Sequence, residues 1–63
     1  MRISLRAARI NRGLTQKESA KELNVTPKTV ASWEKGTTRP STDKVEKICD
    51  LYRLKYDDIT WNA

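Results

Sequence analysis

The stretch TQKESAKELNVTPKTVASWEKG, residues 15–36, predicts two short helices separated by a tight turn. Thr15 and Glu18 have the spacing of a capping box, in which each side chain binds the backbone amide of the other residue. The first helix is therefore predicted to begin at Thr15. Asn24 tolerates positive φ better than most residues and is the expected left-handed residue of the turn.

The second helix of this pair has residues typical of a helix start at one end and of a helix end at the other. Thr26 can cap its first turn, and Pro27 suits the first helical position because its φ is already helical and its missing amide costs nothing there. Gly36 ends the helix. The face that we predict to be buried carries Val30, Trp33 and Glu34. The opposite face is small, polar and basic, and it comprises Pro27, Lys28, Ala31, Ser32 and Lys35.

The rest of the chain adds three short helical segments, and its periodicity contains no alternating run typical of a strand. The first segment covers about residues 2–12 and ends at Gly13. The second begins at Ser41 or Thr42, and its apolar face comprises Val45, Ile48, Cys49 and Tyr52. A last turn or helix covers about residues 56–60. The sequence thus predicts an all-α fold, a compact bundle of five short helices, with residues 1–63 forming a single domain.

Composition argues against several classes of protein. The 63 residues include one cysteine, Cys49, and no histidine, so an internal disulfide and a zinc site of Cys and His ligands are not available. The sequence has no nucleophile–base arrangement and no phosphate-cradling glycine loop, so neither an enzyme nor a cofactor is predicted. No apolar run approaches the ~18 residues of a membrane span, and a lone cysteine fits a reducing cytoplasm.

Positive charge is concentrated in the first two thirds of the chain. Residues 1–39 contain nine Lys and Arg against three Glu, a net charge of +6, whereas residues 40–63 contain four Lys and Arg against five acids, a net charge of −1. A basic surface indicates a polyanionic partner such as nucleic acid. Charge alone is equally consistent with an ordinary solvated basic surface.

Two helices joined by a tight turn, the second short and basic on its outer face, form a helix-turn-helix. The segment RINRGLTQKESAKELNVTPKTVASWEKGTTRPS, residues 9–41, resembles the DNA-binding domain of the phage repressor and Cro family, also called the XRE type. The matching elements are the RGLTQ segment that leads into the second helix, the alanine in the middle of that helix, the turn, the V..WE.G pattern and the loop with its proline. Apolar residues near the C-terminus follow the family's spacing as well, so the resemblance covers nearly the whole chain.

The resemblance implies a sequence-specific regulator of transcription, most readily a phage or prophage-type repressor, with its third helix in the major groove of double-stranded DNA. The implied base-reading positions are Gln16, Pro27, Lys28, Ala31 and Ser32. The implied phosphate contacts are Thr15, Gln16, Thr29, Lys35, Thr37, Thr38 and Arg39. Residue chemistry agrees, since Lys28 can donate to guanine O6 and N7, and the apolar Pro27 and Ala31 suit a thymine methyl group.

The resemblance also assigns residues to the scaffold. Arg9 is implied to form a partly buried ion pair with Glu34 at the end of the third helix, and Trp33 is expected to be a packing residue. Two positions depart from the family pattern: Ser19 stands where a large aliphatic residue is usual, and Asn24 stands where glycine is usual. Ser19 should lower stability unless its hydroxyl finds a carbonyl within its own helix.

Family members generally bind DNA as two-fold dimers, so the resemblance implies a homodimer on a palindromic or pseudo-palindromic operator and weak binding by an isolated domain. The candidate dimer residues are Leu54, Tyr56, Ile59 and Trp61. Among them, Trp61 has no evident core partner in the sequence pattern and is a candidate partner surface.

Several alternatives remain open at this stage. The sequence fits a small Cro-like regulator or the N-terminal domain of a longer repressor, and its abrupt end slightly favours the second. Antitoxins and restriction–modification control proteins share this domain. A different class is a protein-interaction module of antitoxin or anti-regulator type that kept the fold without binding DNA. The basic outer face of the third helix argues against this last alternative.

Overall fold

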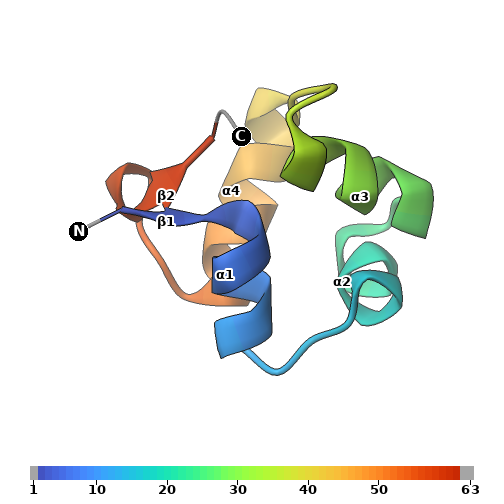
Figure 1. Ribbon diagram of the computed structural model, residues 1–63, viewed down its shortest axis with the longest axis horizontal. Helices are drawn as coiled ribbons and strands as arrows, with labels where there is room; N and C mark the ends of the chain where they lie inside the picture. The colour runs from blue at the N-terminus through green and yellow to red at the C-terminus, as the bar shows by residue number, and fades with distance from the viewer. Residues whose placement is uncertain (1, 62–63) are drawn as a thin grey trace.

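The computed structural model describes residues 2–61, and within that range it contains four helices and one pair of short strands (Figure 1). The helices are α1 (Leu5–Asn11), α2 (Gln16–Leu23), α3 (Pro27–Lys35) and α4 (Thr42–Tyr52). The strands are β1 (Ile3–Ser4) and β2 (Ile59–Thr60), and a single 3₁₀ turn, η1 (Tyr56–Asp58), precedes β2. The strand pair lies on the side of the molecule opposite to α2 and α3 (Figure 1).

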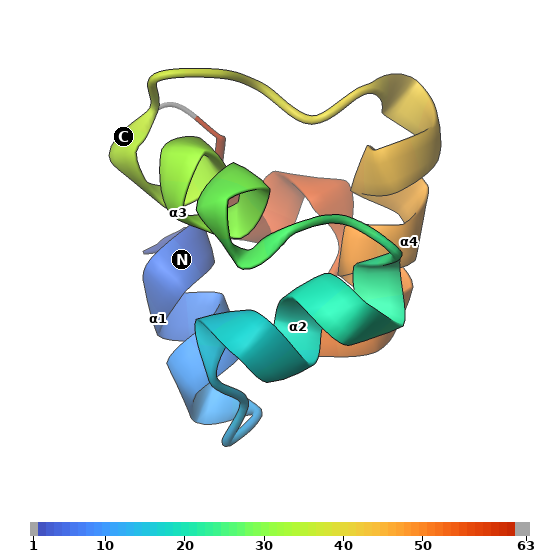
Figure 2. The same cartoon turned by 90° about the vertical axis from the view of Figure 1, so that its right-hand side faces the viewer.

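Helix α2 packs chiefly against α3, and the two lie side by side (Figure 2). The capping box predicted for α2 is confirmed: Thr15 Oγ1 accepts from the Glu18 amide at 3.0 Å, and Glu18 Oε1 accepts from the Thr15 amide at 2.8 Å. Asn24 is left-handed with a φ of 58°, as predicted for the turn. Local sequence signals therefore set the geometry between α2 and α3.

The end signals predicted for α3 and α4 are also confirmed. Thr26 Oγ1 accepts from the Thr29 amide at 3.2 Å, with Pro27 in the first turn, and Gly36 ends α3 with a φ of 83°. Ser41 is the N-cap of α4, because its Oγ accepts from the Lys44 amide at 3.4 Å. After Gly36 the chain runs along the α3 side of the molecule to reach α4 (Figure 2).

The prediction of an all-α bundle of five helices is wrong at both ends of the chain. Residues 2–4 are not helical, because Ser4 is the extended N-cap of α1 and accepts from the Ala7 amide at 3.0 Å. Residues 56–60 are not a helix either, since one 3₁₀ turn is followed by the extended residue Ile59. These two extended ends pair as parallel strands, with Ile3 opposite Ile59. The fold is four helices with a terminal strand pair.

The core is built from all four helices and β2. Its buried apolar residues are Leu5, Ala8, Ala20, Leu23, Val30, Trp33, Ile48, Tyr52 and Ile59. The predictions that Val30 and Trp33 belong to the core are confirmed. Trp61 also packs against this core, stacks on Tyr56 with ring centroids 5.3 Å apart, and donates from Nε1 to the Tyr56 carbonyl at 2.9 Å. The expectation that Trp61 lacks a core partner is therefore wrong.

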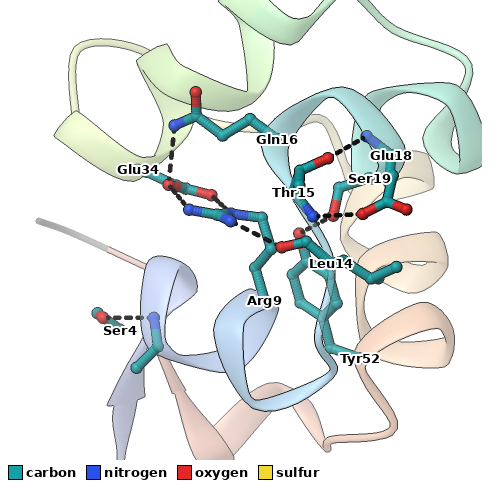
Figure 3. Close-up of polar contacts among 10 residues, drawn as sticks. Ser4, Arg9, Leu14, Thr15, Gln16, Glu18, Ser19, Glu34 and Tyr52 are labelled. Carbon is teal, nitrogen blue, oxygen red and sulfur yellow. Dashed lines mark hydrogen bonds and ion pairs between the residues drawn. The ribbon is translucent and has the colours of Figure 1, made fainter.

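Ser19 is completely buried in this core and has a partner that the sequence does not reveal. The hydroxyl of Tyr52, on α4, donates to Ser19 Oγ at 3.1 Å (Figure 3). A tyrosine from another helix thus satisfies the serine, where the sequence led us to look for a carbonyl within α2. The bond links α2 to α4. It offsets part of the stability lost by having a small side chain where the family usually has a large one.

We expect Tyr52→Phe to lower the free energy of unfolding by about 1–3 kcal/mol, because Ser19 Oγ would stay buried without its donor. Thermal unfolding followed by circular dichroism measures the change, which amounts to about 4–8 °C per kcal/mol in a domain of this size. Tyr56→Phe is the matched control, since Tyr56 is 58% exposed. Equal melting temperatures for the two variants would contradict the stabilising role of the Tyr52 hydroxyl.

Candidate nucleic-acid interface

Helix α3 has a buried face and an open face. Val30 and Trp33 are 2% and 7% exposed, whereas Pro27 and Lys28 are exposed and Ala31 and Ser32 are half-buried. The open face thus combines two exposed cations, Lys28 and Lys35, with small side chains, so the backbone of α3 can approach a partner closely. A basic helix face with small side chains suits close approach to a polyanion.

An ion pair between α1 and α3 anchors α3 to the rest of the molecule (Figure 3). Arg9 Nε donates to Glu34 Oε2 at 2.7 Å, and Arg9 Nη2 donates to Glu34 Oε1 at 3.2 Å. The two side chains are only 10% and 6% exposed. Arg9 Nη1 also donates to the Leu14 carbonyl at 2.8 Å. The hydrogen bond to Glu34 is the main reason that the pKa of Arg9 is raised.

Gln16 is a third member of this network. Its Nε2 donates to Glu34 Oε1 at 3.1 Å, and its amide oxygen points away from Glu34 (Figure 3). The carboxylate of Glu34 therefore receives donors from α1 and from the first turn of α2. The sequence resemblance implied only the Arg9 partner, so the bond from Gln16 is a contact that sequence reasoning missed.

A surface depression lies where α1, the start of α2 and the outer face of α3 meet. Five predicted contact residues line it, namely Thr15, Gln16, Pro27, Ala31 and Lys35. Arg6 and Lys17 line it too. Sequence reasoning missed these two cations, although Arg6 lies three residues before Arg9 and Lys17 directly follows Gln16. The depression therefore brings together three exposed cations from three helices.

The remaining predicted phosphate contacts are spread over a wider area. Thr29 Oγ1 lies 2.9 Å from Thr26 Oγ1 at the start of α3, and Thr37 and Thr38 are exposed in the loop after α3. Arg39 is separate from the depression. It lines a different groove, together with Tyr56 and Trp61 of the C-terminal segment.

Only some of the candidate dimer residues line that second groove. Tyr56 and Trp61 line it, but Leu54 is half-buried against the core and Ile59 is 1% exposed. Ile59 was a wrong candidate for a dimer contact, because its side chain is buried in the core of the same chain. Cys49 also lines the groove; burial, and then the nearby Asp50 and Asp58, raise the pKa of its thiol.

Neither a cluster of metal ligands nor a membrane-length helix is found in the described part of the chain. Residues 2–61 contain no cluster of three or more Cys, Asp or Glu side chains suited to holding a metal ion. No helix in that range has the length and apolar character needed to cross a membrane.

Helices α2 and α3, with the left-handed turn between them and an open basic face on α3, define a helix-turn-helix domain. The family model described as "Helix-turn-helix" matches residues 5–59, and the chain belongs to this XRE-type family. The resemblance stated from residues 9–41 is thereby confirmed. No solved structure gave a significant match.

The curated relatives are named as regulators of transcription. Over 53 residues, 84% of this chain, it is 36% identical to the HTH-type transcriptional regulator ImmR of Bacillus subtilis and spans 42% of that protein's length. It is 33% identical over 61 residues to the uncharacterized HTH-type transcriptional regulator YgzD of the same organism, spanning 92% of that protein. It is 34% identical over 59 residues to an uncharacterized HTH-type transcriptional regulator of Archaeoglobus fulgidus, spanning 84% of that protein.

Proposed function

We propose that this chain is the sequence-specific, double-stranded-DNA-binding part of a transcriptional regulator, with α3 in the major groove. The observation that carries the proposal is the division of α3 into a face fixed to the scaffold through Trp33 and Glu34 and an open face with Lys28 at its start. Membership of the helix-turn-helix family and relatives named as transcriptional regulators support it.

In this proposal the outer face of α3 contacts the base edges, together with Gln16 at the start of α2. The residues that would contact base edges are Gln16, Pro27, Lys28, Ala31 and Ser32. Lys28 is the main candidate for guanine, because an ammonium group can donate to O6 and N7. The half-buried Ala31 and Ser32 are short enough not to hold the helix away from the bases.

Phosphate contacts would surround this reading surface. The candidates are Thr15, Gln16, Thr29, Lys35, Thr37, Thr38 and Arg39, and the surface depression adds Arg6 and Lys17. Such contacts fix the orientation of a protein on the duplex and carry little sequence information. The concentration of positive charge in residues 1–39 would also make binding strongly dependent on salt.

We further propose that the protein binds its operator as a two-fold dimer and represses by occupying it. The groove beside α4 has an apolar part, formed by Pro40, Val45, Tyr56 and Trp61, and a charged part. In the charged part, Arg39 lies in the same groove as Glu46 and Asp50. A two-fold axis pairs each patch with its own copy, so Arg39 of one chain can meet the acids of the other.

The test is selection of binding sites from a randomised duplex library, with affinity then measured against salt concentration. We expect a two-fold motif whose half-sites are about one helical turn apart, and affinity that falls steeply with salt. Lys28→Ala should relax one position of each half-site and cost about 1–3 kcal/mol, whereas Lys47→Ala, on α4, should change neither.

Other results would change the proposal. A motif with a single half-site would contradict the dimer but leave DNA reading intact. Salt-sensitive binding without any motif would contradict sequence-specific recognition. No binding at low salt would contradict the DNA-binding function and would favour a protein-interaction module.

A further inference from the structure

We infer that Lys44 of α4 is a positioning residue for DNA recognition, because its ammonium group fixes the turn that leads into α3. This inference rests on the proposed function and adds to it a residue outside the helix-turn-helix. Lys44 acts through the backbone of Leu23, the last residue of α2, and does not itself contact DNA.

The contact joins the first turn of α4 to the end of α2, which lies beside it (Figure 2). Lys44 is half-buried, and its Nζ donates to the Leu23 carbonyl at 2.8 Å. The last carbonyls of a helix have no partner within the helix, and the negative end of the helix dipole favours a cation. The amides of Asn24 and Val25 leave the Leu23 carbonyl free, because they bond further back in α2. Lys44 therefore caps α2 from another helix.

The two ends of α3 are held in different ways. Near its C-terminal end, Glu34 is bound to Arg9 of α1 by two hydrogen bonds. At its start, the side-chain hydrogen bonds of Thr26 and Thr29 within residues 2–61 join only these two residues to each other. The start of α3 therefore has no polar side-chain anchor of its own to another helix. The bond from Lys44 to the turn before it is the nearest one.

Position at this end of α3 matters for reading bases. Leu23 is only five residues before Lys28, the main candidate for a base contact, and the left-handed Asn24 lies between them. Specific contacts require their groups to be held within about 0.5 Å of the productive position. The general attraction between cations and phosphates is independent of sequence and tolerates a larger shift. Loss of the Lys44 bond should therefore weaken binding to the operator more than binding to other DNA.

The experiment compares Lys44→Met, which keeps an apolar stem without the donor, with Lys47→Met, which removes the same charge from an exposed position of α4. Affinity is measured against salt for the selected operator and for a scrambled duplex, at a temperature where melting curves show each variant folded. We expect Lys44→Met to lose about tenfold on the operator and less than about twofold on the scrambled duplex. The salt dependence should stay that of the wild type, and Lys47→Met should match the wild type throughout.

Two further variants separate positioning from folding. Lys44→Arg keeps a cationic donor and should restore most of the preference for the operator. If Lys44→Met does not fold, Lys44→Gln, which has a shorter and neutral side chain, takes its place with the same expected loss of preference.

Three results would overturn the inference while the regulator proposal stands. A salt slope reduced by about one in Lys44→Met would indicate a direct phosphate contact. Equal losses on the two duplexes would indicate a smaller folded fraction, and an unchanged preference would show that the bond does not position α3. A wild-type protein that prefers no sequence would overturn both proposals.

Discussion

Glu34→Ala should lower the free energy of unfolding by about 3–5 kcal/mol, the range measured when one partner is removed from a buried ion pair. The variant would leave the Arg9 guanidinium charged and buried, with only the Leu14 carbonyl as acceptor. It would also leave Gln16 Nε2 without its acceptor. Small domains have little stability in reserve, so we expect a large part of this variant to be unfolded at room temperature.

Denaturant unfolding and DNA affinity, measured on the same preparation, test this expectation. Both should fall, because α3 loses the contact that fixes it to α1. Glu22→Ala is the matched control, since Glu22 is an exposed acid on α2, and it should change stability by less than about 0.5 kcal/mol. A melting temperature of Glu34→Ala equal to that of the control would disprove the anchoring role of the pair.

A double replacement separates lost pairing from uncompensated charge. In Arg9→Met with Glu34→Leu, no charge is left buried, and such replacements are often neutral or even stabilising. We therefore expect the double variant to be more stable than Glu34→Ala alone. If it were less stable, the cost of Glu34→Ala would lie in lost packing, and the account given for the ion pair would be incorrect.

The second large effect is expected for Ile59→Ala, which should lower stability by about 2–5 kcal/mol. Ile59 is 1% exposed and is paired with Ile3 in the parallel strand pair, so its truncation leaves a cavity between the two ends of the chain. Thr60→Ala, one residue further along the same strand and exposed, should have little effect. Thermal unfolding of the two variants gives the comparison.

The same pair of variants distinguishes a core residue from a dimer contact. Loss of a dimer contact would weaken association and make the melting temperature more dependent on protein concentration. Loss of a core residue lowers the melting temperature equally at every concentration. An Ile59→Ala variant with wild-type stability at high dilution would contradict the burial of Ile59 within one chain.

Sequence reasoning succeeded where a structural feature depends on residues close together in the chain. The capping box of Thr15 and Glu18, the left-handed Asn24 and the end of α3 at Gly36 each involve residues at most four positions apart. Burial of Val30 and Trp33 followed from helical periodicity alone. The open face of α3, as a set of residues, was predictable for the same reason.

Sequence reasoning failed where a side chain's partner lies far away in the sequence. Nothing local to Ser19 indicates the hydroxyl of Tyr52, 33 residues later, and nothing local to Gln16 indicates Glu34, 18 residues later. A turn or helix was predicted over about residues 56–60, and the strand at Ile59 was missed, because the extended form of Ile59 depends on pairing with Ile3 at the other end of the chain. A two-residue strand has no periodicity to read.

The sequence by itself thus determined the four main helices, the turn between α2 and α3, and the family. The tertiary structure decided how the ends of the chain pair, that Ile59 belongs to the core, and in which direction the amide of Gln16 points. The physical reason is that caps and turns are satisfied within one turn of helix, whereas a buried hydroxyl, a carboxylate or a strand edge takes whichever partner the packed helices bring within hydrogen-bonding distance.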